Sequence, residues 1–376
     1  MSAAHQSHRL TDAPLQWLSR LIARSSVQAR VARWPLGGRL ARRDGDEIFD
    51  ILQGFVKSQT LLALIELDIL ERLLDAPATA EQLGLVADIP VNRMARLLAA
   101  GAAIGLLKRQ RGERYRLARR GAAILGVPGL MQMIRHNAVL YRDMADPVRL
   151  LRGGQTTELS QFWPYVFGAG GEVDAETAAR YSKLMADSQQ LVAQDTLRMV
   201  DLRGVGTLLD VGGGSGAFLR AALRHCPDAH AILFDLPEVM PSAEKAFDVA
   251  GLSDRVTLIP GSFRSEALPL GADVITLVRV LYDHEDDTVK HLISKVYEAL
   301  PRGGRLIISE PMSGGERPEP AGDVYFNFYT MAMGTGQVRS ANEIGQLCAD
   351  AGFVEIRMPR APRPFVTSVV TCAKPV

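Results

Sequence analysis

Glycines and a carboxylate occur in this chain at a spacing that suits the binding of a nucleoside. A short, mostly apolar run at 207–211 is followed at once by four glycines, Gly212, Gly213, Gly214 and Gly216. A strand that turns through glycines into a helix brings bare backbone and the helix N-terminus up to a ligand. Asp235 follows the next apolar run, about 20 residues beyond the glycines, where nucleotide-binding folds bind ribose hydroxyls. The pattern predicts a site for a nucleoside-bearing cofactor.

The length and composition are those of a globular protein with one large or two ordinary domains. The chain has 376 residues, of which 47% are hydrophobic and 23% are charged. Its net charge of +1 gives no overall field that favours nucleic acid. The cysteines, Cys226, Cys348 and Cys372, suit a reducing compartment and give no metal-ligand spacing. Because no apolar run is long enough to span a membrane and no secretory signal is recognised, we expect a cytoplasmic protein.

The elements that position the glycine site fall into four predicted regions: 1–44, 45–130, 131–200 and 201–376. Region 1–44 is a basic N-terminal arm with eight arginines against two aspartates. Leu15, Leu18 and Ile22 recur in it at helical spacing, which suits a segment that lies on an anionic membrane surface. A solvated arm, or an arm that packs on a partner subunit, is the alternative.

Region 45–130 is predicted to form a winged helix. An apolar helical pattern begins at Ile48, a capped helix starts at Thr79, and another helix runs over 91–104. Two short strands around a turn at 111–113 then make a hairpin. The many basic residues of this hairpin raise a DNA-binding regulator as an alternative function. The helix at 91–104 is mostly apolar, however, whereas base readout needs several polar side chains on one face. We therefore favour a dimerisation unit and expect no nucleic acid partner.

From residue 207 the pattern alternates strand and helix, which predicts an α/β fold with a mostly parallel sheet. Region 131–200 before it is predicted to be helical and rich in methionine and aromatic residues, with a glycine-rich break at 168–171. Strands are predicted at 207–211, 230–235, 255–259, 273–280 and 305–310. Two extended runs at the end, 353–358 and 364–372, leave no room for a crossover helix and must pair antiparallel. This ending suits the Rossmann-like, seven-stranded sheet of a methyltransferase better than a pyridine-nucleotide dehydrogenase, the hydride-transfer alternative.

Five ordered motifs carry a resemblance to a known family. They are LLDVGGGSG, FDLPEVM, the segment around Gly261-Ser262-Phe263, LVRVLYDHEDD and GRLIISEPM. Over residues 46–376 the chain resembles the O-methyltransferases of the plant caffeate and bacterial polyketide type. Within that family it is most similar to bacterial carotenoid methyltransferases acting on hydroxyneurosporene and demethylspheroidene. The C-20 methyltransferases of bacteriochlorophyll synthesis and the polyketide enzymes are the neighbouring alternatives. The resemblance implies an S-adenosylmethionine-dependent O-methyltransferase that is a homodimer with interlocked N-terminal domains.

The same resemblance implies which residues hold S-adenosyl-L-methionine. They are Gly212, Gly213, Asp235, Leu236, Ser262, Phe263 and Arg279. The two glycines would lie against the methionine part, Asp235 would bind the ribose, and Leu236 would pack beside the adenine. Ser262 stands where the family usually has an acidic residue that contacts adenine, and Phe263 matches the apolar residue after it. Arg279 stands where a basic residue often approaches the cofactor carboxylate.

The catalytic motif of the family is altered in this chain. The family's His-Asp-Trp reads Tyr282-Asp283-His284 here, so a tyrosine replaces the usual base. Glu310 matches the first supporting glutamate, whereas the second falls at Val338 and its carboxylate is absent. Methyl transfer is an in-line displacement, in which alignment and a dry pocket supply most of the catalysis. We predict that Tyr282 positions the acceptor hydroxyl, that His284 accepts its proton directly or through water, and that Asp283 orients its neighbours. Capping of the helix at 286–300 is the alternative role of His284.

The methyl acceptor is predicted to be an apolar small molecule. A methionine-rich pocket suits a carotenoid hydroxyl, a tetrapyrrole and a polyketide equally well. The overall resemblance favours the carotenoid. Because a carotenoid resides in the bilayer, we expect the basic arm to promote peripheral association with the photosynthetic membrane.

Overall fold

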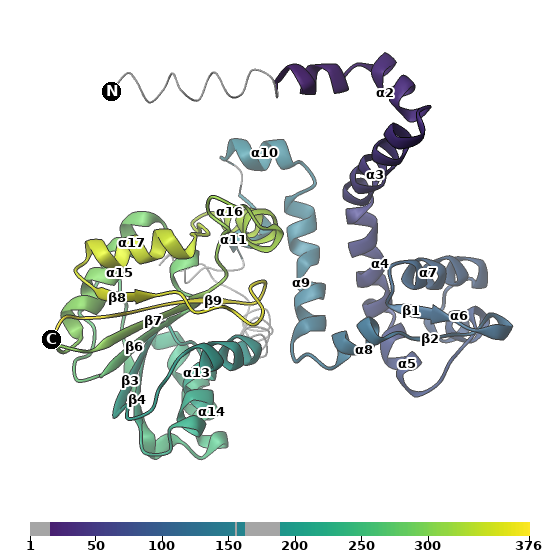
Figure 1. Ribbon diagram of the computed structural model, residues 1–376. Coiled ribbons are helices and arrows are strands. Elements are labelled where there is room, and N and C mark those ends of the chain that lie inside the picture. Colours follow the sequence, from purple (N-terminus) through teal and green to yellow (C-terminus); the bar gives the residue numbers. More distant parts are fainter. Residues whose placement is uncertain (1–15, 155, 162–188) are drawn as a thin grey trace. The chain divides into compact units, whose positions relative to one another are not determined.

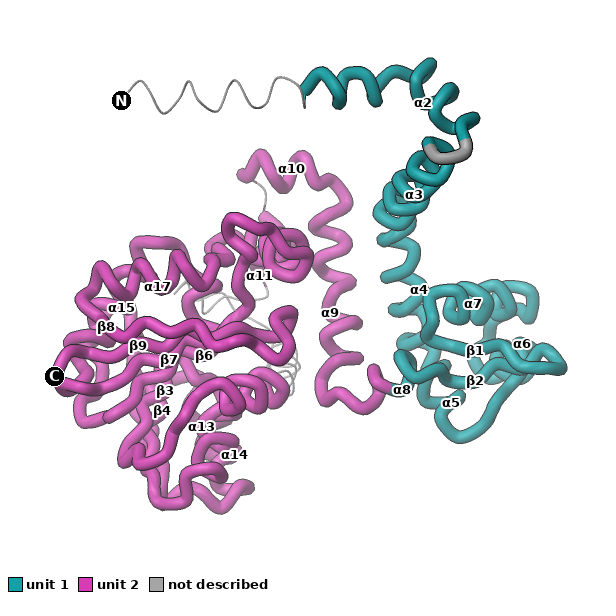
Figure 2. The backbone as a smooth tube through the Cα atoms, viewed as in Figure 1, with its two compact units in different colours: residues 1–122 teal, residues 123–376 magenta. Residues whose placement is uncertain are grey.

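The computed structural model describes residues 16–154, 156–161 and 189–376 (Figure 1). The chain divides into two compact units, Met1–Ala122 and Ala123–Val376 (Figure 2). Each unit is described by itself. The finer division into four regions stays a prediction.

The first unit consists of helices followed by a small hairpin. Its elements are α2 (Ser25–Ala32), α3 (Pro35–Leu52), α4 (Gly54–Glu66), α5 (Ile69–Asp75), α6 (Ala80–Ala87), α7 (Val91–Ala103), β1 (Leu107–Arg109) and β2 (Tyr115–Leu117). Thr79 and Gln82 form the capping box that starts α6, at the helix start predicted from the sequence. β1 pairs antiparallel with β2 around Gly112, whose φ of 69° favours glycine. The predicted order of helices and hairpin is therefore present.

The apolar helical face that the sequence predicts from Ile48 lies on α3 and α4. Ile48, Ile51, Leu52 and Phe55 are 64–81% exposed, so these side chains find little cover within this unit. An exposed apolar row of this length marks an interaction surface. Among the described residues no single helix is both long and apolar enough to cross a bilayer. Gly37–Leu52 and Gly54–Glu66, bent by 48°, reach that length and composition only when taken together.

The second unit contains a seven-stranded sheet. In spatial order its strands are β5 (Val256–Pro260), β4 (His230–Asp235), β3 (Thr207–Val211), β6 (Val274–Val278), β7 (Arg305–Glu310), β9 (Ser368–Ala373) and β8 (Val354–Arg357). The first five are parallel to one another, whereas β9 runs antiparallel to both β7 and β8. The parallel order and the antiparallel end both agree with the sequence prediction. The carboxyl ends of β3, β4, β6 and β7 consequently meet at one edge.

Helices cover both faces of this sheet (Figure 1). Leu209 and Val211 of β3 pack in the core that α15 (Asp286–Ala299) and α17 (Ala341–Asp350) share with the sheet. Leu208 of the same strand packs in a second core, with α13 (Ala217–His225) and α14 (Met240–Ala250). Because alternate residues of a strand face opposite sides, both faces of β3 must be apolar. That requirement explains the short, almost continuous apolar runs in the sequence.

A separate helical group completes the second unit. It comprises α9 (Leu130–Asp143), α10 (Pro147–Arg152), α11 (Glu158–Gln161), η6 (Pro320–Phe326) and α16 (Asn327–Met333), while α8 (Arg119–Leu125) spans the boundary with the first unit. Leu140, Leu150, Leu159 and Met333 form the apolar core of this group. Most of the described residues between 131 and 200 are helical, as predicted, whereas residues 153–154 and 156–157 are not. The predicted glycine-rich break at 168–171 lies outside the described residues.

Two strand predictions were too long. The predicted strand 273–280 ends at Val278, because Arg279 adopts a left-handed conformation with φ of 58°. The predicted run 364–372 begins only at Ser368, and a turn occupies the residues before it. The first difference has consequences for the site, since the chain leaves β6 where the catalytic motif begins.

Candidate active site

The glycine turn links β3 to α13 and leaves its backbone bare. Gly212, Gly214 and Gly216 have φ values of 69°, 59° and 72°, which side chains rarely tolerate. At Gly213 a β-carbon would lie 2.3 Å from Asp210 Oδ2, so this position has no room for a side chain either. At Gly216 it would lie 2.2 Å from Phe247 Cζ. Glycine is therefore required in this turn both by the positive φ values and by the lack of room for a side chain.

Asp235 ends β4 beside this turn. The backbone N–H of Gly214 donates to Asp235 Oδ2 at 2.7 Å, and that of Leu236 donates to Oδ1 at 2.7 Å. Burial raises the pKa of Asp235, and these two hydrogen bonds oppose the rise. The structure thus brings together the glycines, Asp235 and Leu236, as predicted from their spacing. Their roles toward a cofactor remain predictions at this point.

Asp210 is a further candidate site residue, which was not identified from the sequence. It is fully buried in β3, and Thr276 Oγ1 donates to its Oδ1 at 2.6 Å. Its Oδ2 has no hydrogen-bond partner among the described residues, and burial raises its pKa to about 7. An unpaired carboxylate oxygen beneath a bare glycine turn fits a ligand that carries a positive charge. An acidic residue inside an apolar strand was the signal in the sequence.

The loop after β5 places Ser262 and Phe263 next to this edge. Gly261 N–H donates to the carbonyl of Asp235 at 2.8 Å, which ties the loop to the end of β4. Ser262 N–H donates to Glu266 Oε1 at 2.9 Å, and Lys295 Nζ donates to the carbonyl of Phe263 at 2.7 Å. The Phe263 ring meets His284 edge-on, with ring centroids 5.3 Å apart. His284 therefore lies on the same side as the loop of Ser262 and Phe263.

The altered catalytic motif forms a short turn, η5 (Leu281–Asp283), directly after β6. Glu310 ends the neighbouring strand β7, and its Oε2 accepts the backbone N–H of Tyr282 at 3.1 Å. Arg279 Nη2 donates to the Tyr282 hydroxyl at 3.1 Å. The structure thus brings Arg279, Tyr282, Asp283 and Glu310 together at the carboxyl edge of the sheet. Arg279 occupies a strained backbone conformation, as residues at functional sites often do.

Asp283 of this turn and Glu310 beside it have perturbed pKa values. Burial raises the pKa of Asp283 to about 7, although the Arg279 guanidinium and the Tyr282 side chain oppose the rise. Burial likewise raises the pKa of Glu310 to about 8, against its backbone bond to Tyr282. Asp283 Oδ1 and Glu310 Oε1 are buried and have no hydrogen-bond partner among the described residues. Unpaired carboxyl oxygens with pKa values near neutrality suit proton transfer.

His284 has a different environment. Its ring is buried, and its Nδ1 accepts a hydrogen bond from Arg264 Nη2 at 3.1 Å. Burial, together with the charges of Arg264 and Arg339, lowers the pKa of His284 to about 3. The histidine therefore stays neutral with one ring nitrogen already engaged. The role of His284 as the proton acceptor stays a prediction.

Arg339 is the second residue that the sequence reasoning missed. Its side chain is 2% exposed and bonds Asp286 Oδ1 at 2.6 and 2.9 Å. It also donates to the carbonyls of Leu281 at 3.1 Å and His284 at 2.9 Å. Arg339 follows Val338, where the second family carboxylate is absent. A buried cation thus holds the carbonyls of the catalytic turn.

A polar pair lies in the otherwise apolar helical group. His136 Nε2 and the Tyr329 hydroxyl are 3.1 Å apart, and both side chains are buried. Burial lowers the pKa of His136 to about 4 and raises that of Tyr329 well above its usual range. The helix α16, which carries Tyr329, packs against η5, so the helical group adjoins the catalytic turn. Sequence reasoning did not identify this pair, because its partners are 193 residues apart.

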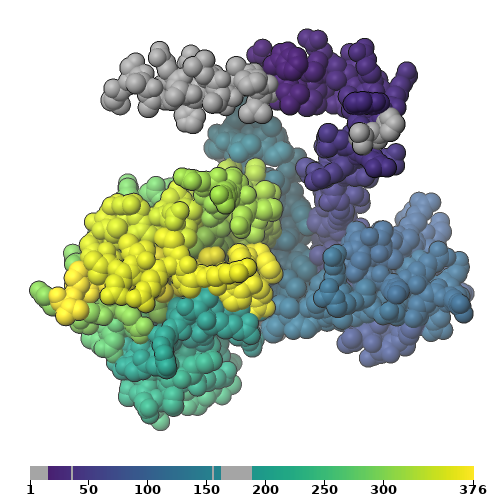
Figure 3. All heavy atoms as spheres, in the orientation of Figure 1, coloured from purple at the N-terminus to yellow at the C-terminus, as the bar shows by residue number. Residues whose placement is uncertain are grey.

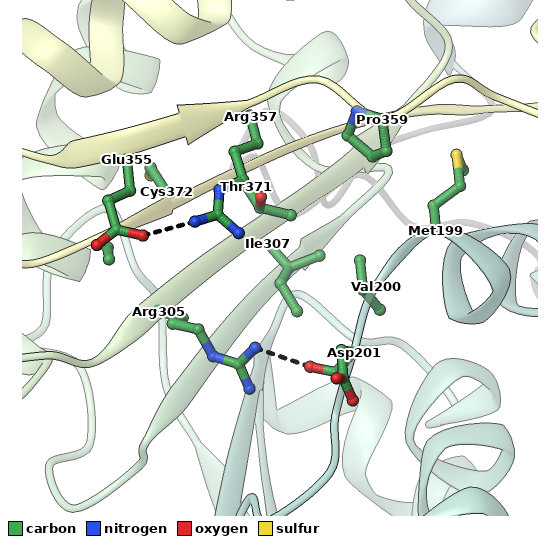
Figure 4. Close-up of a pocket in the computed structure, with 11 residues that line it drawn as sticks. Met199, Val200, Asp201, Arg305, Ile307, Glu355, Arg357, Pro359, Thr371 and Cys372 are labelled. Carbon is green, nitrogen blue, oxygen red and sulfur yellow. Dashed lines mark hydrogen bonds and ion pairs between the residues drawn. The ribbon is translucent and has the colours of Figure 1, made fainter.

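A surface hollow of about 240 Å³ lies at the opposite end of β7 (Figure 4). Arg305 begins that strand and donates to the carbonyl of Asp201 at 2.7 Å, while Arg357 pairs with Glu355 at 2.9 Å. Arg305 lines the hollow, whereas Glu310 ends the same strand at the catalytic turn. None of the predicted site residues lines the hollow. The candidate active site is the carboxyl edge of the sheet.

Comparison with known proteins shows the family of this chain. Residues 141–354 match the O-methyltransferase domain, and residues 49–127 match the O-methyltransferase dimerisation domain. The chain belongs to the O-methyltransferase family. Its family, fold class, enzyme class and S-adenosyl-L-methionine cofactor are as the sequence predicts. The dimerisation domain supports the predicted homodimer and contains the exposed apolar residues Ile51, Leu52 and Phe55.

Two curated relatives and one solved structure are similar to this chain over most of its length. The chain is 52% identical to demethylspheroidene O-methyltransferase of Cereibacter sphaeroides, over 95% of this chain and 94% of the relative. It is 53% identical to the protein of that name from Rhodobacter capsulatus, over 90% and 84% of the two chains. The crystal structure of human N-acetylserotonin methyltransferase in complex with S-adenosylmethionine matches with a TM-score of 0.74. That match covers 89% of this chain and 98% of the human chain at 21% identity, and it shows the shared fold.

Asp235→Ala should weaken S-adenosylmethionine binding by about 1.5–3 kcal/mol, the cost of losing hydrogen bonds to a charged group. Titration calorimetry on the folded variant measures this change. Glu238→Ala is the matched control, because Glu238 is an exposed carboxylate three residues away. Unchanged affinity in the Asp235 variant would remove this residue from the cofactor site.

Proposed function

We propose that this enzyme methylates the hydroxyl group of a carotenoid, demethylspheroidene or hydroxyneurosporene, in carotenoid biosynthesis of the spheroidene type. The observation that carries the proposal is the identity of 52–53% to two proteins named demethylspheroidene O-methyltransferase, over nearly the whole chain. Relatives named for other acceptors are more distant, such as the 31% identical 3-hydroxy-5-methyl-1-naphthoate 3-O-methyltransferase of Streptomyces sahachiroi.

The helical group beside the catalytic turn supports a long apolar acceptor. Leu140, Leu150, Leu159 and Met333 are buried in it, and Met144 and Met331 pack against them. Flexible thioether side chains adapt to an extended hydrocarbon. The His136–Tyr329 pair supplies polar groups next to the turn, where the hydroxyl end of such an acceptor would lie. We assign the body of the acceptor to this group and its hydroxyl to the turn.

The residues at the carboxyl edge fit the cofactor. Gly212 and Gly213 would lie against the methionine part, Asp235 would bind the ribose, and Leu236 and Phe263 would flank the adenine. The unpaired Asp210 Oδ2 beneath the turn suits the positive charge of the methionine end. S-adenosylmethionine supplies an activated methyl group when bound. Ser262 would face the adenine without the acidic contact that the family usually provides.

Asp283 is the residue that we assign as proton acceptor. Its Oδ1 is buried and unpartnered among the described residues, and burial raises its pKa to about 7. Above that pH the carboxylate is ionised and can take the hydroxyl proton as the new C–O bond forms. His284, neutral and bonded to Arg264, is better suited to the adenine side. This assignment replaces the histidine of the family pattern with the next residue of the motif.

Residues in and around the turn position Asp283. Glu310 holds the backbone of Tyr282, and Arg339 holds the carbonyls on either side of it. Arg279 bonds the Tyr282 hydroxyl, so the tyrosine is fixed next to the acceptor group. Burial raises the pKa of Tyr282, which keeps its hydroxyl protonated and able to hydrogen-bond the Asp283 carboxylate. Tyr282 thus orients the hydroxyl that Asp283 deprotonates.

The acceptor also suggests where the enzyme acts. A carotenoid resides in the bilayer, so its hydroxyl must be reached from a membrane surface. We therefore propose that the homodimer associates peripherally with the photosynthetic membrane. The basic arm and its exposed apolar residues support this localisation.

The purified enzyme should transfer label from S-adenosylmethionine to demethylspheroidene or hydroxyneurosporene in detergent. Bacteriochlorophyll-type tetrapyrroles and polyketide phenols, offered under the same conditions, should accept far less. Mass spectrometry of the product locates the new methyl group on oxygen. Preferential methylation of a tetrapyrrole carbon or of a phenol would overturn the proposed acceptor.

Asp283→Asn should lower turnover by about 10²-fold or more, the usual contribution of a general base. Wild-type turnover should rise with pH through about 7, because only the ionised Asp283 accepts a proton, and the variant should lack this rise. Turnover at saturating cofactor, measured across pH, checks both expectations.

Glu310→Gln is the matched control for this titration. Its amide oxygen can still accept the Tyr282 N–H, and Asp283 is intact, so the rise near pH 7 should persist. If Asp283→Asn turns over at nearly the wild-type rate while His284→Ala does not, the proton acceptor is His284.

A further inference from the structure

We propose that the described part of the basic arm, residues 16–44, is a binding surface for anionic phospholipid bilayers. The inference rests on the proposed function, since a bilayer-resident acceptor gives the enzyme a reason to bind lipid. It goes further, because it assigns the contact to particular side chains and specifies the lipid charge.

The charge of the arm is strongly one-sided. Residues 16–44 contain seven arginines and one acidic residue, Asp44. The arginines are Arg20, Arg24, Arg30, Arg33, Arg39, Arg42 and Arg43, and all of them are exposed. Among the described residues, Arg43 alone of the seven takes part in a salt bridge, with Glu47 at 2.9 Å. Six guanidinium groups are therefore available to phosphate groups, which guanidinium binds well.

The arm also exposes large apolar side chains along its helices. Trp17 and Trp34 are 64% and 67% exposed, and Leu18, Ile22 and Leu40 are 45–59% exposed. The intervening helix α2 buries none of its residues. The described arm residues lie among the purple spheres of Figure 3. Tryptophan together with arginine is the combination that favours the boundary between headgroups and acyl chains.

A second copy of the chain is the competing occupant. The dimerisation domain match begins at residue 49, after the arm, and the exposed apolar residues Leu52 and Phe55 fall within it. The arm lies outside both family matches. Two like-charged arms would repel each other, whereas an anionic bilayer attracts each of them. Charge complementarity therefore favours the bilayer.

The test uses the full-length enzyme and carotenoid-free vesicles. The triple variant Arg20→Gln, Arg24→Gln and Arg30→Gln should bind vesicles of phosphatidylcholine and phosphatidylglycerol about 100-fold more weakly than the wild type. The matched control neutralises Arg93, Arg96 and Arg111, three exposed arginines of the same unit outside the arm, and should bind as the wild type does. Co-sedimentation measures the binding, and vesicles of phosphatidylcholine alone should bind weakly throughout.

A second variant tests the apolar contribution. Trp17→Ala with Trp34→Ala should reduce vesicle binding at high salt, where screening removes most of the charge attraction. Wild-type binding by both arm variants, or binding that is indifferent to phosphatidylglycerol, would overturn the inference. So would a change of oligomeric state in the arginine variant with vesicle binding retained, which would identify a second copy as the occupant.

Turnover with detergent-dispersed acceptor separates this inference from the proposed function. Loss of vesicle binding with retained turnover supports the inference. If the enzyme methylates no carotenoid but still binds vesicles through the arm, the lipid-binding inference is supported. The proposed acceptor is then wrong.

Discussion

The hydrogen bond from the Tyr282 backbone to Glu310 is the interaction on which the site depends. It joins the ends of two parallel strands, β6 and β7, and fixes the turn that carries the catalytic motif. Arg339 completes the restraint by donating hydrogen bonds to the carbonyls of Leu281 and His284. A turn held from both its N–H and its carbonyl groups keeps Asp283 in one place. Such restraint is what alignment in a displacement reaction requires.

The carboxyl edge of the sheet carries an electrostatic cost. Asp210, Asp283 and Glu310 are all carboxyls whose pKa values burial raises to about 7 or 8, and each keeps one unpartnered oxygen among the described residues. Leaving buried polar atoms unpaired destabilises a fold. A cationic cofactor and a hydroxyl acceptor would supply the missing partners. We therefore propose that these carboxyls serve bound ligands rather than the stability of the free chain.

Local patterns in the sequence predicted most of the fold, whereas long-range contacts determined what was missed. The glycine turn and Asp235 could be placed because a strand, a turn and a second strand follow one another within 30 residues. The roles of Arg339 and His136 depend on partners 53 and 193 residues away, which spacing does not reveal. His284 could be located but its environment could not, because Arg264 reaches it from another loop. The left-handed conformation of Arg279 could not be predicted, because its apolar neighbours favour a longer strand.

The central claim is that Asp283, held by Glu310 and Arg339, receives the proton of the acceptor hydroxyl. A crystal structure of the enzyme with S-adenosylhomocysteine and the hydroxylated carotenoid tests it most directly. The account predicts the acceptor oxygen within hydrogen-bond reach, about 2.6–3.2 Å, of the Asp283 carboxylate and next to the Tyr282 hydroxyl. An acceptor oxygen that instead contacts His284, with Asp283 turned away from it, would contradict the account.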